Sequence, residues 1–194
     1  MKLPSLFKTQ KFYSLFASVF NSGIALVTFS LLARALSKEE FGNWAFFLAV
    51  YGFVEMALNG MIRTPVIRMG ANREEYNYPQ VIASAWDVMI KMALGLGALG
   101  GLSFLGYYFL FSGDQLILNI AYWFPLYLIV SVPRLISIWN SNAIIRFQRI
   151  IVIRAIDVSV FLLGVAKIYI WGGTFSEIFW YYLLSNVLTS VFSL

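Results

Sequence analysis

The stretch LSKEEFGNW, residues 36–44, decides the fold because it places a helix start between two long apolar segments. Ser37 precedes Glu40 by three residues, the spacing of a capping box, in which each side chain accepts a hydrogen bond from the other residue's backbone N–H. Leu36 and Phe41 occupy the positions of a hydrophobic staple, a contact that sets the angle at which a chain enters a helix. The stretch therefore predicts two apolar helices that meet in a short polar turn.

Composition indicates which solvent these helices face. Of the 194 residues, 60% are hydrophobic and 12% are charged, and the mean hydropathy is +0.78. Runs of about 20 apolar residues, the length that crosses a hydrocarbon core of about 30 Å, recur along the chain. The formal net charge of +5 does not point to nucleic acid, because the basic residues lie between apolar runs and not along one face. We therefore expect an all-α integral membrane protein.

Six transmembrane helices fit the pattern of apolar runs, and we expect them to form a single transmembrane domain over residues 1–194. Pro125 and Pro133 are expected to bend the fourth helix, because proline removes a backbone hydrogen bond from a helix interior. The expected spans are about 12–32, 41–62, 79–111, 116–140, 156–171 and 176–194.

Glycines in the third expected span predict a tightly packed face. Glycine is a poor choice in a water-soluble helix, but in lipid small residues let two helices approach closely. The glycines concerned are Gly95, Gly97, Gly100 and Gly101.

The distribution of basic residues predicts the orientation in the membrane. Nine of them lie at the N-terminus and in the links between the second and third and the fourth and fifth spans, against two at the opposite turns. Because cytoplasmic links carry an excess of Lys and Arg, the N-terminus is expected in the cytoplasm. The nine are Lys2, Lys8, Lys11, Arg63, Arg68, Arg73, Arg146, Arg149 and Arg154, and the two are Arg34 and Lys38.

The wider string LLARALSKEEFGNWAFFLAVYGFVEMALNGMIRTPVIR, residues 31–68, resembles the start of the polysaccharide flippases, which move O-antigen and other oligosaccharides. That family belongs to the exporter superfamily that also contains the multidrug (MATE) exporters and the lipid II flippases. The end of the second helix resembles the family more loosely, through Asn59, Gly60, Arg63, Thr64 and Arg68. The sharper match is the turn after the first helix, at Arg34, Ser37, Glu40, Phe41 and Gly42.

The resemblance implies a fold and a function. The six helices would be the N-terminal lobe of a MATE-like flippase with two lobes. Such a transporter flips a polyprenyl-pyrophosphate-linked oligosaccharide from the cytoplasmic to the outer leaflet for surface polysaccharide (lipopolysaccharide O-antigen) synthesis, by alternating access. The implied location is the bacterial inner (plasma) membrane, and the implied partners are the bilayer, the lipid-linked oligosaccharide and a second lobe.

The end of the chain carries a further expectation. The sixth expected span runs to Leu194 without the basic anchor that usually follows a helix emerging in the cytoplasm. We expect a fragment whose second lobe follows in the same full-length chain. The alternative is a half-transporter that pairs with a second copy.

Polar groups inside the expected spans are the candidates for a substrate cavity, because burying them in lipid is costly. By resemblance, cationic side chains would offset the pyrophosphate charge, and Asp87 or Glu55 would carry a coupling H+ or Na+. The alternative is structural: Asp87 pairs with Lys91, Glu55 pairs with Arg63, and Arg134 extends to the membrane surface. The candidates are Glu55, Asn59, Arg63, Asp87, Lys91 and Arg134.

Catalysis is not expected. The chain has no Cys and no His, which removes thiolate chemistry, the usual zinc ligands and the commonest general base. It also lacks a phosphate-binding loop of the form GxxxxGK[ST]. We expect no catalytic residue, no metal, no organic cofactor and no nucleic-acid partner. The alternatives within the membrane class are a MATE-type drug exporter and a non-transporting accessory or scaffold subunit of a glycan-assembly complex.

Overall fold

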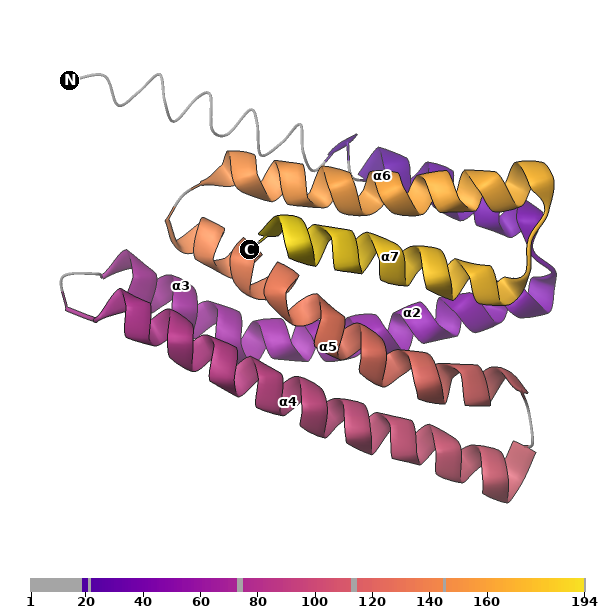
Figure 1. The fold of residues 1–194 in the computed structure, drawn as a ribbon, viewed down its shortest axis with the longest axis horizontal. Helices are drawn as coiled ribbons and strands as arrows, with labels where there is room; N and C mark the ends of the chain where they lie inside the picture. The colour runs from indigo at the N-terminus through magenta and orange to yellow at the C-terminus, as the bar shows by residue number, and fades with distance from the viewer. Residues whose placement is uncertain (1–18, 21, 73–74, 113–114, 145, 194) are drawn as a thin grey trace.

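The structure, a computed structural model, describes residues 19–20, 22–72, 75–112, 115–144 and 146–193, and within them it contains helices and no strand. The helices run back and forth, so that α2 begins and α6 ends at one end of the molecule (Figure 1). After the first helix, Ser22–Ala35, they are α2 Lys38–Leu58, η1 Asn59–Arg63, α3 Thr64–Ala71, α4 Tyr78–Tyr107, η2 Tyr108–Ser112, α5 Gln115–Ala143, α6 Phe147–Trp171 and α7 Phe175–Ser193.

The predicted capping box starts α2. The Glu40 backbone N–H donates to Ser37 Oγ at 3.2 Å, and the Ser37 backbone N–H donates to Glu40 Oε2 at 3.0 Å. The Phe41 ring packs edge-on against Phe29 of the first helix, with ring centroids 4.7 Å apart. The polar turn therefore both begins α2 and holds the first helix beside it.

The second helix is longer than the expected 41–62. α2, the π-helical turn η1 and α3 form one continuous helix, Lys38–Ala71, of 34 residues. Pro65, the second residue of α3, has no backbone N–H to bond one turn back, and the widened π-helical turn just before α3 accommodates it without ending the helix. Arg63 and Arg68 consequently lie within the helix and not in a link.

The fifth helix also begins earlier than the expected residue 156, since α6 starts at Phe147. The expectation was wrong because a search for apolar runs assigns Arg149 and Arg154 to a link, although arginine is a good helix former. Arg149 donates to the backbone carbonyl of Ser193, one of the last carbonyls of α7, which have no partner inside their own helix.

The remaining expected spans agree with the structure to within a few residues, at α4 with η2, at α5 and at α7. Of the first expected span, residues 12–18 and 21 lie outside the described residues, and the helix from Ser22 runs on to Ala35. The all-α class is confirmed for the described residues. Within the part of the chain that the structure describes, three helices are long and apolar enough to cross a membrane: Lys38–Ala71, Tyr78–Phe111 and Ile117–Ala143.

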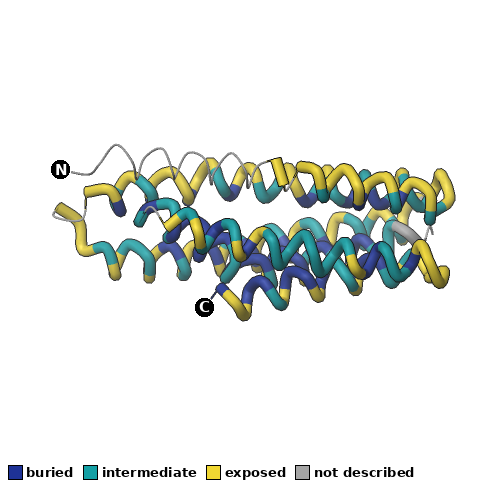
Figure 2. The backbone as a smooth tube through the Cα atoms, turned by 90° about the horizontal axis from the view of Figure 1, so that it is seen from above, coloured by how far each residue is buried: buried dark blue, intermediate teal, exposed yellow. Residues whose placement is uncertain are grey.

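Helix α5 forms the centre of the packing, with α4 on one side and α7 on the other (Figure 1). Aromatic rings fill the space where α2, α5 and α7 meet: Trp44 lies edge-on to Phe179 with centroids 5.3 Å apart, and Phe47 packs on Tyr127 at 5.2 Å. The Tyr127 hydroxyl donates to the carbonyl oxygen of Phe179. Seen from above, the buried residues lie between the helices and the exposed ones cover the outside (Figure 2).

The predicted glycine face packs against α5, with one exception. A Cβ added at Gly97 would lie 3.2 Å from Pro125 Cα, one at Gly101 would lie 3.0 Å from Pro125 Cγ, and one at Gly100 would meet the Phe124 ring. Gly95 does not belong to this face, because a Cβ there would have nothing within 4 Å. The α4–α5 contact thus leaves little room for side chains at Gly97, Gly100 and Gly101, and it does not restrict Gly95.

Candidate functional site

A charged cavity of about 380 Å³ lies among the first helix, α2, η1, α5 and α6. Three guanidinium groups and two carboxylates line it, so its lining carries a net positive charge. These side chains come from elements that are far apart in the sequence, and only the packing of the helices brings them together. They are Glu55, Arg63, Arg134, Arg154 and Asp157.

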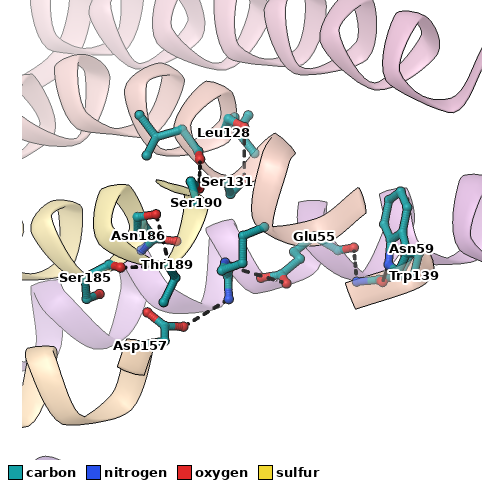
Figure 3. Close-up of polar contacts among 12 residues, drawn as sticks. Glu55, Asn59, Leu128, Ser131, Trp139, Asp157, Ser185, Asn186, Thr189 and Ser190 are labelled. Carbon is teal, nitrogen blue, oxygen red and sulfur yellow. Dashed lines mark hydrogen bonds and ion pairs between the residues drawn. The ribbon is translucent and has the colours of Figure 1, made fainter. Parts of the chain in front are cut away.

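Arg134 connects the two carboxylates. Its Nη1 lies 3.1 Å from Asp157 Oδ2, and its Nη2 lies 3.8 Å from Glu55 Oε1. The arginine side chain is only 11% exposed, against 18% for Asp157 and 26% for Glu55. Figure 3 shows the Glu55 and Asp157 carboxylates reached by dashed lines from the side chain that lies between them. Arg134 therefore links α2, α5 and α6 through one internal ion-pair network.

This network contradicts two expectations from the sequence, one about Arg134 and one about Glu55. Arg134 does not extend to a surface, because its charge is neutralised inside the bundle. Glu55 pairs with Arg134 and, in the described part of the chain, not with Arg63. The π-helical turn between Glu55 and Arg63 changes the register that the eight-residue spacing assumed, and the tertiary partner lies closer.

Asn59 stands beside this network and ties η1 to α5. The Trp139 indole Nε1–H donates to Asn59 Oδ1 at 2.8 Å, and Asn59 Nδ2 donates to the Glu55 backbone oxygen at 2.9 Å. Figure 3 shows Asn59 and Trp139 next to Glu55. The oxygen and the nitrogen of the Asn59 side-chain amide are both hydrogen-bonded within the protein. Asn59 therefore shapes the cavity wall and has little remaining capacity to bind a ligand.

Arg63 and Arg154 differ from Arg134 in their exposure and in their ion pairing. Both line the cavity and both are exposed, and no ion pair of either is present among the described residues. Arg63 also borders a second cavity of about 580 Å³, which includes Arg68. The positive charges that a bound ligand could contact are therefore those of Arg63 and Arg154.

Asp157 and Arg154 were not among the candidates taken from the sequence. Asp157 is an acidic residue inside an apolar stretch, which was the available signal, but nothing in the sequence identifies its partner on α5. The pattern of apolar runs places Arg154 in a link. Both enter the site because α6 begins at Phe147 and runs along the cavity.

Asp87 and Lys91 lie elsewhere. Lys91 Nζ donates to Asp87 Oδ2 at 2.7 Å, as the pairing alternative predicted. The two side chains are 60% and 72% exposed, respectively, on the outer surface of α4. The structure does not bring this pair into the charged cavity.

An apolar cavity of about 210 Å³ adjoins the charged one. The two cavities share Ala25, Asp157 and Val158 in their linings. Trp44 and Phe161 form part of the apolar wall. An ionic compartment and an apolar compartment thus meet along the first helix and α6.

The residues of the turn motif lie far from the charged cavity, although Phe41 contacts Phe29, which lines the apolar cavity. Ser37 and Glu40 are engaged in the capping box, and Phe41 packs on Phe29. With a rise of 1.5 Å per residue, Glu55 is about 27 Å along the helix from Ser37. Arg34 and Gly42 are exposed at this turn, so the motif has a structural role in the bundle.

Among the described residues, no group of three or more acidic side chains is arranged to hold a metal ion. No protein-family model, curated protein or solved structure matches this chain. The function is therefore argued from the two cavities.

Proposed function

We propose that this chain is one lobe of a bacterial inner-membrane transporter that flips a polyprenyl-pyrophosphate-linked oligosaccharide to the outer leaflet. The observation that supports this most directly is the junction of the net-cationic cavity with the apolar one at Ala25, Asp157 and Val158. A substrate with an anionic headgroup and an isoprenoid tail has the same two parts. Helices long enough to cross a membrane provide the setting.

The charged residues divide into two roles under this proposal. Arg134 is neutralised by Asp157 and Glu55 and holds three helices together, so it positions the site. Arg63 and Arg154 are the exposed cations that contact the pyrophosphate. Arginine suits this role because its planar guanidinium forms paired, charge-assisted hydrogen bonds with phosphate oxygens.

Glu55 is the residue that we assign to the coupling ion. Its contact with Arg134 is long, at 3.8 Å, and its side chain is the more exposed of the two carboxylates in the network. Taking up a proton or Na+ there would loosen Arg134 from α2 while its bond to Asp157 remains. Asp87 is not assigned this role, since it lies outside the cavity.

The transport cycle would follow alternating access. A second lobe, in the same full-length chain or in a second copy, would close the open side of the cavity, and rocking of the two lobes would expose it to each side of the membrane in turn.

The test is export of surface glycan by the full-length protein carrying Arg63→Gln or Arg154→Gln. The loss of one charge-assisted hydrogen bond costs about 1.5–3 kcal/mol, so export at limiting substrate should fall by about tenfold or more. Arg146→Gln is the matched control, because Arg146 is exposed next to α6 but outside the cavity. Surface glycan and membrane protein level are measured together.

Each competing function gives a different result in this experiment. A non-transporting scaffold predicts normal export in all three arginine variants at normal protein level. A MATE-type exporter predicts that the wild type protects cells from cationic drugs, and that Glu55→Gln abolishes this protection while the glycan is unaffected.

A further inference from the structure

The outer face of α4 contains a feature that lipid does not explain. The Asp87–Lys91 ion pair is mostly exposed, on a helix of 34 residues that is long and apolar enough to cross a membrane. Lys91 lies about 20 Å from the start of this helix and about 30 Å from its end. A charged pair at that depth is unfavourable against hydrocarbon, so protein or water must cover it.

The residues in line with this pair are small or polar. They recur every three or four positions, which places them on one side of the helix. All of them are exposed, and we refer to them as the outer α4 face: Gln80, Ser84, Asp87, Lys91, Gly95 and Ala98.

Gly95 is informative because its own bundle does not need a glycine there. A Cβ at Gly95 would have nothing within 4 Å, whereas one at Gly97 would lie 3.2 Å from Pro125 Cα. The packing of α5 thus leaves little room for a side chain at Gly97 and does not restrict one at Gly95. In lipid, small residues on an exposed helix face allow the close approach of another helix.

We propose that the outer α4 face is the contact surface for a second copy of this chain in the same membrane orientation. The carboxylate of Asp87 and the ammonium of Lys91 are 2.7 Å apart, so both charges lie at nearly the same height along the helix. A two-fold axis along the membrane normal places the second pair at that height too. The four groups then form a ring of alternating charge, and each carboxylate lies between two ammonium groups.

This contact leaves the charged cavity open. The cavity is lined from the first helix, α2, η1, α5 and α6, and in Figure 1 α4 lies along the opposite edge of the molecule from α6. Self-association through α4 therefore does not depend on the proposed transport function, and a failure of either idea leaves the other intact.

The chain has no cysteine, so a single introduced cysteine reports proximity without background. The full chain with Ala98→Cys, reconstituted into phosphatidylethanolamine–phosphatidylglycerol vesicles, should form a disulfide-linked dimer on mild oxidation. The control is Gly52→Cys on α2, which is exposed and has no atom within 4 Å of an added Cβ. It should remain monomeric.

Energy transfer between labelled copies measures the association itself, with the label on Ser176→Cys, an exposed position on α7. The wild type should show transfer that rises with the protein-to-lipid ratio. Gly95→Leu should shift this rise to at least a tenfold higher ratio, and Gly52→Leu should not. Circular dichroism should show the same helix content for both variants, since both sites have open space.

Charge exchange gives the strictest test. Asp87→Lys copies carry two cations on the face and Lys91→Asp copies carry two anions, so each should lose self-association, whereas a mixture of the two should recover it. The proposal is overturned if the wild type stays monomeric at every ratio, if Gly95→Leu behaves as Gly52→Leu does, or if the mixture fails to recover. Any of these results would assign the face to a different protein or to the second lobe.

Discussion

Two sets of opposite charges in this molecule look alike in the sequence and behave differently in the structure. Arg134 is 11% exposed and joins Glu55 and Asp157 from three different helices. Lys91 is 72% exposed, and its one ion-pair partner among the described residues is Asp87, one turn away on the same helix. An ion pair between helices holds the bundle together, whereas one within a helix adds little to the packing of the protomer. The surroundings of a charge, and not its depth in a span, therefore decide its role.

Replacing Arg134 should have the largest effect on the stability of the bundle. Arg134→Met leaves two partly buried carboxylates without their cation, and the loss of one partner from a buried ion pair costs about 3–5 kcal/mol. We expect a large fall in the thermal unfolding temperature in detergent, followed by circular dichroism. The same substitution at Lys91 is the control.

A companion variant examines the cause of this fall. Combining Arg134→Met with Glu55→Gln and Asp157→Asn removes all the charges of the network and should recover part of the stability. If the triple variant is no more stable than Arg134→Met, the side-chain volume of the arginine and not its charge holds the three helices.

Filling the α4–α5 contact should have the next largest effect. A side chain at Gly100 would meet the Phe124 ring, so Gly100→Val should destabilise the bundle by about 1–3 kcal/mol. Gly95→Val, which points into open space, should change stability much less. Equal losses in the two variants, measured by thermal unfolding in detergent, would contradict the packing described for α4.

The capped turn before α2 should contribute a smaller amount to the free energy of unfolding. Ser37→Ala removes the acceptor of the Glu40 N–H bond, and the loss of a helix cap of this kind costs about 1 kcal/mol. The expected result is a modest decrease in unfolding temperature with unchanged export at permissive temperature. Ser176→Ala, at an exposed site on α7, is the control.

Breaking the Asp87–Lys91 ion pair should have the smallest effect on the stability of the isolated protomer. Lys91→Met in detergent should change stability by about 0.5 kcal/mol or less, because an exposed pair one turn apart contributes little. The same variant should weaken self-association in vesicles. A loss of several kcal/mol in the monomeric protein would instead make the pair an internal support and remove the contrast with Arg134.

Local chemistry allowed the sequence to predict the individual elements. The capping box depends on two residues three positions apart, and the spans depend on continuous apolar length, so neither needs knowledge of the rest of the chain. The same reasoning failed at Pro65 and at Arg149, where α3 continues and α6 has already begun. There a π-helical turn and the good helix propensity of arginine outweighed signals that usually end a helix.

The sequence by itself determined an all-helical chain with apolar helices of membrane-spanning length, a capped turn at Ser37 and the list of charges that had to be accounted for. Only the tertiary structure decided that Arg134 pairs with Asp157, that Arg154 joins the cavity and that Asp87 and Lys91 face outward. Helix periodicity relates residues within one helix, but the rotation of each helix about its axis follows from the packing of rings and glycines between helices. The partners of buried charges depend on that rotation.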